Sequence, residues 1–452
     1  MIPDRIKQMM IKLETAGFEV YIIGGAVRDY YLGLTPYDWD LFTNATGEEI
    51  KKVFPQGVVI GGEERQKKIL TVVVDGVEIS QYRSNGARTA LGHSLTTHQA
   101  TCDFTINSIA MDKDMSVTDP NNGIRDIWAK QLRFVGNADD RIKEDPLRIL
   151  RGYRFMCKYG MKDIDKALDK NIMLLHDLPK ERVSTEMLKI LSIPNPCNNT
   201  KKIILELIKS FIKEMDKCIG MPGGDHHNEV VDVHMCNALT EAFKITNNPL
   251  LRLTAFLHDI GKGVTQSFVE DDKQTHFYEH EKKGSEIVED WMTEFKFSNE
   301  AIKYVSTLIR LHMYSYKDEP SKKSYIKFFN KLNDAKIPIE DYVMLIYCDH
   351  QGNMNKPRIK FGDFIKGNFL YKEYQKITYS EEPMTIKDLK VSGKDVMEVC
   401  NMKPGLEIGV VLKELFNNVM DGTIKNTRAE LLNSLKYWSR GRVMKENVRK
   451  EK

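Results

Sequence analysis

The chain has 452 residues, which is enough for two to four domains with cores of their own. With 41% hydrophobic and 29% charged residues, its composition excludes a disordered chain. A net charge of +3 is too small to indicate nucleic-acid binding by itself. No apolar run reaches the roughly 20 residues of a membrane helix, and the first residues lack the apolar stretch of a secretory signal. We therefore expect a cytoplasmic protein with no membrane partner.

The distribution of cysteines and charges adds two expectations. The seven cysteines are scattered without a CxxC pair, which indicates reduced thiols and not a disulfide or zinc framework. Positive charge gathers in the last stretch, SRGRVMKENVRKEK. This basic tail either binds phosphates through counterion release or is a frayed, solvated terminus.

Strand patterns occur near the start of the chain. Val20–Ile23 is a short apolar run that ends in a Gly-Gly turn, which predicts a buried strand. Leu70–Val74 and Val77–Tyr82 flank Asp75-Gly76. Because Asp-Gly between two β-rich runs is a strong turn signal, these residues predict a hairpin.

From about Asp145 onward the pattern is helical. Asp145 suits the N-cap and Pro146 the first position of a helix, and Gly160 suits its C-cap. Loops rich in Pro, Asn and Gly separate later helical segments. We therefore predict an α+β fold with a small α/β head at 1–138, a helical neck at 139–220, a helical domain at 221–355 and a helical tail at 356–452.

The segment GGAVRDYYLGLTPYDWDLFT, Gly24–Thr43, carries two features suited to nucleotide chemistry. The Gly24-Gly25 turn lets the backbone approach a phosphate closely, and Arg28 could hold a phosphate oxygen. Asp38 and Asp40 would share one face of a strand, where two carboxylates repel each other unless a cation lies between them. Mg²⁺ suits such oxygen ligands, and two such ions can activate a hydroxyl and stabilise a leaving pyrophosphate.

Glu78 is a candidate third carboxylate, although an exposed strand residue is an equal alternative. A DxD pair or a Gly-Gly turn alone is common on protein surfaces. Their combination closely resembles class II CCA-adding enzymes and bacterial poly(A) polymerases. Further family motifs follow in order: DFTINSIAMD at Asp103–Asp112, DPNNGIRDI at Asp119–Ile127, EDPLRILRGYRF at Glu144–Phe155, KERVSTEMLKIL at Lys180–Leu191 and KPGLEIG at Lys403–Gly409.

The resemblance implies a polymerase β-like nucleotidyltransferase head that adds CMP and AMP, from CTP and ATP, to the 3′ end of tRNA, and a tail that binds tRNA. The same head motifs leave a poly(A) polymerase as an alternative. The implied catalytic residues are Asp38, Asp40 and Glu78. The implied nucleotide-binding residues are Gly24, Gly25, Arg28, Asp103, Asn107, Asp145, Arg148, Arg151 and Arg154.

Asp145 and Arg148 are three apart on the predicted helix, so their side chains are neighbours. Cytosine and adenine both present an amine donor beside a ring-nitrogen acceptor, which a carboxylate and a guanidinium can match. One such match discriminates by roughly 1–3 kcal/mol. The resemblance implies that this pair selects the base. Spacing alone favours another reading, in which Asp145 caps the helix and Arg148 pairs with a neighbouring acid.

Thr101 and Cys102 depart from the family, which has two arginines before Asp103. A preceding acidic residue is also missing, and Gly86–Thr97 lies where the family has a flexible loop linked to the switch from C to A. We expect weaker nucleotide binding from this loss. The product is then CCA, or C alone, or A alone.

Most of the histidines fall between residues 220 and 355. Imidazole and carboxylate groups together suit transition metals, and ligands from separate helices converge in a packed bundle. The candidate ligands are His234, His258, Asp259, His280, His312 and Asp349. Their order resembles the HD phosphohydrolase superfamily, which implies a divalent metal such as Mn²⁺ or Ni²⁺ and hydrolysis of phosphorylated tRNA ends. A regulatory HD protein with an inactive head is the alternative, and the intact Asp38 and Asp40 argue against it.

Overall fold

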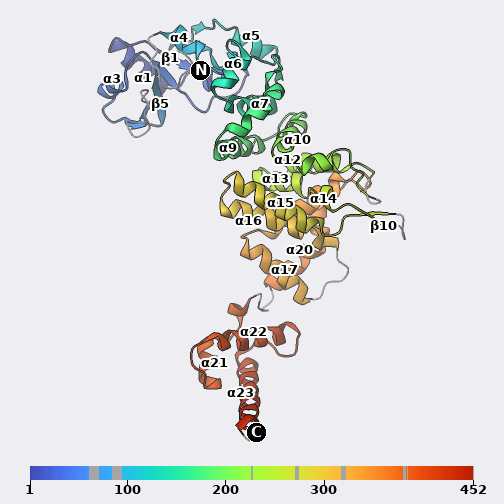
Figure 1. Ribbon diagram of the computed structural model, residues 1–452. Helices are drawn as coiled ribbons and strands as arrows, with labels where there is room; N and C mark the ends of the chain where they lie inside the picture. The colour runs from blue at the N-terminus through green and yellow to red at the C-terminus, as the bar shows by residue number, and fades with distance from the viewer. Residues whose placement is uncertain are drawn as a thin grey trace. The chain divides into compact units, whose positions relative to one another are not determined.

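The computed structural model describes residues 1–60, 71–83, 94–224, 228–269, 274–316, 322–379, 383 and 385–450, with the backbone alone at 315, 316, 322, 379 and 440–450. The chain divides into two compact units, Met1–Ile212 and Lys213–Lys452. The first unit mixes strands and helices, and the second is almost wholly helical (Figure 1). The predicted α+β class is confirmed.

A seven-stranded sheet of order β3-β4-β5-β2-β1-β6-β7 forms the head. Its strands are β1 Val20–Ile23, β2 Leu41–Thr43, β3 Val58–Ile60, β4 Thr71–Val74, β5 Val77–Gln81, β6 Ala110–Met111 and β7 Val117–Thr118. Neighbouring strands are antiparallel except β2 and β5, which are parallel. The predicted strand and hairpin are both present, with positive φ at Asp75 and Gly76; Leu70 lies outside the described residues.

Helices surround this sheet and continue beyond it. They are α1 Asp4–Thr15, α2 Gly25–Tyr31, α3 Gly47–Val53, α4 Leu95–Ala100, α5 Gly123–Trp128, α6 Ala138–Glu144, α7 Leu147–Tyr159, α8 Ala167–Lys170, α9 Lys180–Leu191 and α10 Thr200–Phe211, with 3₁₀ turns at Thr105–Asn107 and Ile172–Asp177. Two short parallel strands, β8 Gln131–Leu132 and β9 Lys162–Asp163, lie among them.

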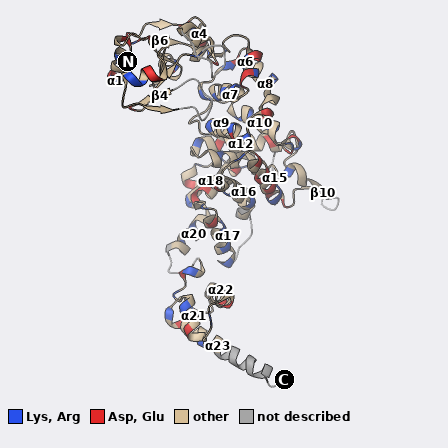
Figure 2. Cartoon of the chain, turned by 60° about the vertical axis from the view of Figure 1, so that its left-hand side comes forward, with Lys and Arg blue, Asp and Glu red and all other residues tan. Residues whose placement is uncertain are grey.

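Helix α7 connects the helical part of this unit to the site described below. It begins one residue later than predicted, at Leu147, but the Asp145 carboxylate still accepts the Leu147 N–H at 3.3 Å. Gly160 ends it with φ 68°, as the C-cap prediction requires. Apolar side chains such as Leu150 and Tyr153 bury one side. Arginines recur along the helix at a spacing of three, and the basic residues are blue in Figure 2. This spacing places the basic residues on a shared face.

The second unit is a helical bundle followed by a small helical tail. Its elements are α11 Met215–Cys218, α12 Val231–Ile245, α13 Pro249–Leu257, α14 Lys262–Thr265, β10 Ser267–Val269, β11 Gln274–His276, α15 His280–Glu294, α16 Asn299–Leu311, η4 His312–Tyr316, α17 Lys322–Asp334, α18 Ile339–Gly352, α19 Phe361–Gly367, α20 Phe369–Tyr379, η5 Ile386–Asp388, α21 Gly393–Cys400, α22 Leu406–Met420 and α23 Arg428–Lys450. Helix α12 packs on α13 and α18, and α16 packs on α13 and α15. These packed helices bring distant ligands together.

The tail has an apolar cluster of its own. Val396, Leu431 and Leu435 are fully buried in it, together with residues of α22. The motif KPGLEIG leads into α22. The side chains of the basic stretch, from residue 440, lie outside the described residues. In the part of the chain that is described, no helix is long and apolar enough to cross a membrane.

A close backbone contact fixes the start of α15 in the bundle. A Cβ atom at Gly261 would lie 2.0 Å from the His280 carbonyl oxygen, whereas one at Gly284 would meet its nearest atom at 3.2 Å. Because backbone cannot move aside as a side chain can, we expect Gly261→Ala to cost about 1–3 kcal/mol of stability. Calorimetry should show a lowered unfolding temperature for this variant and a smaller change for Gly284→Ala. Equal unfolding temperatures for both variants would contradict the contact.

Candidate functional site

A pocket of about 660 Å³ opens beside the sheet of the first unit. Its size lies within the usual range of small-molecule sites. The predicted residues that line it are Gly24, Gly25, Arg28, Asp38, Asp40, Asp103, Asn107, Arg148, Arg151 and Arg154. Glu78 and Asp145 are not among its lining residues. Segments far apart in the sequence therefore meet at one cavity.

The sequence predicts a strand at Asp38 and Asp40. In the structure, both residues lie in the irregular segment just before β2. The ladder between β1 and β2 ends at the Ile22–Leu41 pair, and β1 is followed by the turn at Gly24, which has φ 96°. The antiparallel pairing with β1 therefore does not continue to the two aspartates. Both carboxylates still line the pocket.

Glu78 completes a cluster of three carboxylates. In the parallel ladder Leu41 faces Ile79, which places the preceding residues, Asp40 and Glu78, beside each other. Burial, followed by the charges of Asp38 and Glu78, raises the pKa of Asp40 to about 7. Oxygen donors that repel one another in this way fit a divalent cation.

Arg28 is held rigidly at the pocket wall. Its guanidinium donates to the Asp29 carboxylate at 2.7 and 2.9 Å and to the Asn107 side-chain oxygen at 2.8 Å. It also lies 5.1 Å from the ring centres of both Phe155 and Tyr159. These contacts fix the direction of a buried cation before any ligand is present.

Asp103 links this arginine to α7. One carboxylate oxygen accepts from Asn107 Nδ2 at 2.9 Å, and the other accepts from Arg151 at 2.6 and 2.7 Å. Burial acts to raise the pKa of Asp103, but the Arg151 charge and these hydrogen bonds hold the pKa below its ordinary value. Arg151 is thus partly neutralised, and Arg154 is similarly paired with Glu186 at 3.1 Å.

Asp145 and Arg148 occupy different surroundings. Arg148 is buried, lines the pocket, and donates to the Arg141 carbonyl and, at 2.8 Å, to Glu144. Asp145 accepts from Arg182 at 3.3 Å. The structure therefore contains both contacts of the structural alternative: Asp145 accepts a backbone N–H at the start of α7, and Arg148 pairs with the neighbouring acid Glu144. Arg148 nevertheless presents its side chain to the cavity.

Thr101 and Cys102 also line the pocket, and their backbone carbonyls accept hydrogen bonds from a distant arginine. Arg141 donates to the carbonyl oxygens of Thr101 and Cys102 at 2.6 and 2.9 Å. Burial raises the pKa of the Cys102 thiol to about 12, so this cysteine is not a nucleophile at neutral pH. The flexible-loop expectation, Gly86–Thr97, falls largely outside the described residues.

The pocket also contains residues that the sequence did not single out. Tyr37, Arg83, His98 and Lys158 line it. His98 Nδ1 accepts the Arg83 backbone N–H at 3.2 Å, and burial, then the charge of Arg83, lowers the pKa of His98 to about 3. This imidazole is therefore neutral, with its proton on Nε2. No local pattern signals these residues, because the fold alone brings them to the cavity.

The six predicted ligands of the second unit converge. Two groups of three have their ligand atoms within 4.8 Å of one another: His234, His258 and Asp259 form one group, and Asp259, His280 and His312 form the other. Asp349 lies 3.1 Å from His234 Nε2 and 3.6 Å from His258 Nε2. All six are buried. Asp259 belongs to both groups, so it can bridge two ions.

The tautomers of three histidines suit metal binding. The Nδ1 atoms of His258, His280 and His312 lie 3.0, 2.8 and 2.6 Å from backbone carbonyl oxygens, to which they can only donate. Their Nε2 lone pairs are then left for a metal. The facing Nε2 atoms of His280 and His312 are only 3.2 Å apart. Two such acceptors repel unless a cation or proton lies between them.

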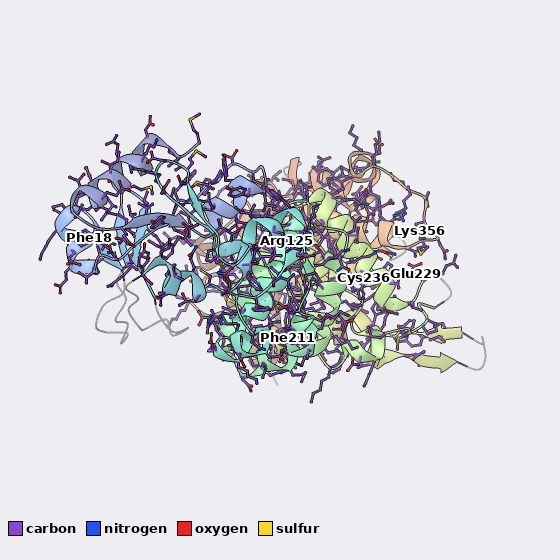
Figure 3. The ribbon with its side chains drawn as sticks, turned by 90° about the horizontal axis from the view of Figure 1, so that it is seen from above. Phe18, Arg125, Phe211, Glu229, Cys236 and Lys356 are labelled. Carbon is purple, nitrogen blue, oxygen red and sulfur yellow. The ribbon has the colours of Figure 1, made fainter. Side chains whose placement is uncertain are left out.

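Two partners of this cluster were missed by the sequence analysis. Lys262 is buried 2.8 Å from the Asp259 carboxylate, and its place in LHDIGKG, three residues after Asp259, was an available signal. Glu229 lies 3.1 Å from His234 Nδ1 and accepts from the Met354 N–H. Figure 3 labels Glu229 next to Cys236, which belongs to α12, and Lys356 nearby. Nothing in the sequence pattern marks Glu229.

Comparisons with known proteins agree with this arrangement. Residues 20–133 match the model of the poly A polymerase head domain, 231–346 that of the HD domain, and 365–435 that of tRNA nucleotidyltransferase domain 2. The CCA-adding enzyme of Ligilactobacillus salivarius is 26% identical over 96% of this chain and 97% of its own.

Two solved structures share the fold. The Bacillus stearothermophilus CCA-adding enzyme in complex with CTP has a TM-score of 0.65 and 20% identity, covering 99% of this chain and 100% of its own. The Thermotoga maritima CCA-adding enzyme complexed with tRNA has a TM-score of 0.52 and 16% identity, covering 96% and 94%. The likeness extends over nearly the full length in both cases.

The burial of Asp40 beside two other carboxylates predicts a stability effect. Since folding raises this pKa from 3.8 to about 7, the ionised carboxylate destabilises the native state increasingly from about pH 4 to pH 7, and constantly above. With a chelator present at pH 8, Asp40→Asn should therefore be more stable than the wild type by up to a few kcal/mol of unfolding free energy, and it should unfold at a higher temperature. The difference should shrink towards pH 4. A lower unfolding temperature for the variant at pH 8 would contradict the raised pKa of Asp40.

Proposed function

We propose that this chain, a member of the CCA-adding enzyme family with a fused HD domain, adds CMP and AMP to the 3′ end of tRNA without a nucleic-acid template. The observation that supports this proposal most directly is one cavity lined by Asp38, Asp40 and the arginines of α7. The related structures described with CTP and with tRNA support these substrates. The proposal includes the division at 138, 220 and 355, a tail that binds tRNA, and action in the cytoplasm.

The head residues fit a nucleotidyl transfer. Asp38 and Asp40, with Glu78, would hold Mg²⁺, which when bound activates the attacking hydroxyl and stabilises the leaving pyrophosphate. The 3′ oxygen of the tRNA forms a bond to the α-phosphorus as the α–β phosphoanhydride bond breaks. Arg28 and the glycine turn lie where the triphosphate can be held. Asp103 and Asn107 would position the ribose.

Loss of either aspartate should stop this reaction. We expect Asp38→Ala and Asp40→Ala to lower nucleotide addition by at least about a thousandfold, because each leaves the metals without a ligand. The assay uses tRNA that lacks its 3′ end, each labelled nucleotide in turn, and sequencing of the product. Glu48→Ala, which removes an exposed acid of α3 in the same head, is the matched control.

The sequenced product separates the alternatives. Addition of CCA supports the proposal, repeated A identifies a poly(A) polymerase, and C alone or A alone identifies a specialised enzyme. Full wild-type activity in either aspartate variant would overturn the assignment of the head site.

Thr101 and Cys102 bear on this outcome. Compared with the family pattern, these two residues leave the cavity without two cationic side chains. Arg28, Arg83 and Lys158 still line the cavity. The Arg141 bonds to the two backbone carbonyls keep the segment before Asp103 in place. We infer that nucleotide binding is weakened by this departure and not abolished.

Base selection is assigned to Asp145 and Arg148. Arg148 lies at the cavity, and its side chain can exchange Glu144 for a base edge, while Asp145 would accept from the exocyclic amine. Arg148→Ala should therefore lower the preference for CTP and ATP over UTP and GTP by about tenfold. Single-nucleotide incorporation rates measure this preference. Arg182→Ala tests the partner of Asp145, and a uniform fall across all four nucleotides in Arg148→Ala would identify the pair as structural.

A second activity is favoured by the buried histidine cluster. We propose that its two ligand groups bind divalent metal, Mn²⁺ or Ni²⁺ by the ligand type, and hydrolyse phosphate esters at damaged tRNA ends. Metal at such a site lowers the pKa of a bound water and polarises the phosphoryl oxygen. Lys262 would hold Asp259 in place. Removing a 2′,3′-cyclic or terminal phosphate would expose the hydroxyl that the head requires.

The two activities should separate by mutation. Asp259→Ala should abolish hydrolysis of a cyclic-phosphate substrate with added Mn²⁺, Ni²⁺ or Co²⁺, because both metal groups share this carboxylate. Nucleotide addition to an undamaged tRNA should change less than about twofold, since the head supplies its own ligands. Asp290→Ala, at an exposed position of α15, is the control. Loss of both activities would show that Asp259 supports the fold, and a wild type inactive with every metal would refute the hydrolase.

A further inference from the structure

Tyr37 is an unusual lining residue of the head cavity. Its side chain is 99% exposed, although tyrosine commonly buries much of its ring. It follows Pro36, whose ring restricts the backbone, and it directly precedes Asp38. A single exposed aromatic residue is ordinary on a protein surface. Its position at the catalytic carboxylates is what separates Tyr37 from the rest.

The other aromatic residues of the cavity already have partners. Phe155 and Tyr159 enclose Arg28, and the Phe42 ring lies 4.5 Å from the His98 ring, centre to centre. Among the described residues, Tyr37 has no ring or cation contact of this kind. An aromatic face is therefore open to a ligand beside Asp38.

We propose that Tyr37 stacks on the base of the terminal nucleotide of the tRNA, the nucleotide whose 3′ hydroxyl attacks. This inference rests on the proposed function of the head. The attacking hydroxyl must lie at Asp38 and Asp40, so the base on the same ribose lies close to the preceding residue. The incoming base is assigned to Arg148 instead, on α7.

The chemistry of stacking suits this position. During addition of CCA, the terminal base is first any base of the tRNA and then cytosine. Hydrogen-bond recognition would favour one base, whereas every base has a π-face and stacks on an aromatic ring. Recognition of the tRNA end by Tyr37 would thus tolerate the change of base after each addition.

The test compares Tyr37→Ala with Tyr37→Phe and with Trp128→Ala, which removes an exposed aromatic side chain that does not line the cavity. Tyr37→Ala should raise the KM for tRNA by about tenfold, as expected for the loss of one base–aromatic stack. The KM for CTP should change less than about twofold, because the incoming base is bound elsewhere. Tyr37→Phe, which keeps the ring face, and Trp128→Ala should resemble the wild type.

A tRNA minihelix with an abasic terminal nucleotide makes the test specific. This substrate has no terminal base to stack, so the wild type and Tyr37→Ala should extend it with equal KM. The rise in KM from removing the base and the rise from removing the ring should therefore not be additive. An unchanged KM for intact tRNA in Tyr37→Ala overturns the inference, as does an equal effect of this variant on intact and abasic substrates. A rise in the KM for CTP alone would assign the ring to the incoming nucleotide. Failure of the wild type to extend intact tRNA would instead overturn the proposed function, and the inference with it.

Discussion

Repulsion between like groups held close together is the constraint on which both sites of this molecule depend. In the head, burial and then the charges of Asp38 and Glu78 raise the pKa of Asp40. In the bundle, histidine Nε2 atoms face each other at 3.2 Å in two pairs, His234 with His258 and His280 with His312. Neither arrangement is favourable by itself, and each becomes favourable with a cation. The fold must therefore supply the energy that holds them, through the sheet in one unit and packed helices in the other.

The polar groups around each site are fixed in direction before a ligand arrives. Arg28 is enclosed by two rings and two hydrogen-bonding side chains, and Arg151 is held by Asp103. In the bundle, backbone carbonyls set the tautomers of His258, His280 and His312. Such preorganisation reduces the free energy that a substrate or metal would otherwise spend on ordering side chains.

The sequence predicted the parts of this arrangement that follow a local period. The strand at Val20–Ile23, the Asp-Gly hairpin and the helix ending at Gly160 all depend on neighbouring residues, and the structure has them. The ordered motifs predicted the family, and the comparisons agree. The roles of individual site residues stay predictions, to be settled by the variants described above.

Contacts between distant segments could not be predicted from the sequence. The strand expected at Asp38 and Asp40 was wrong, because pairing with β1 stops at Leu41, and that depends on where β1 turns. The bonds from Arg141 to the carbonyls of Thr101 and Cys102 span about 40 positions and involve no side chain of the accepting residues. Residue patterns carry no signal for a backbone acceptor, so these bonds could not be predicted from the sequence.

Burial of the ligands in the bundle has a consequence for exchange kinetics. Each of the six candidate ligands has at most 8% of its surface exposed. The His280 backbone approaches Gly261 so closely that a methyl group would not fit between them. If these residues hold a metal, an exchange path that requires local opening of the surrounding helices would slow its release. The lifetime of the ion would then depend on the opening rate of the bundle as well as on the strength of single metal–ligand bonds. The occupant would depend in part on which metal is present as the bundle closes, a history that equilibrium affinities do not record.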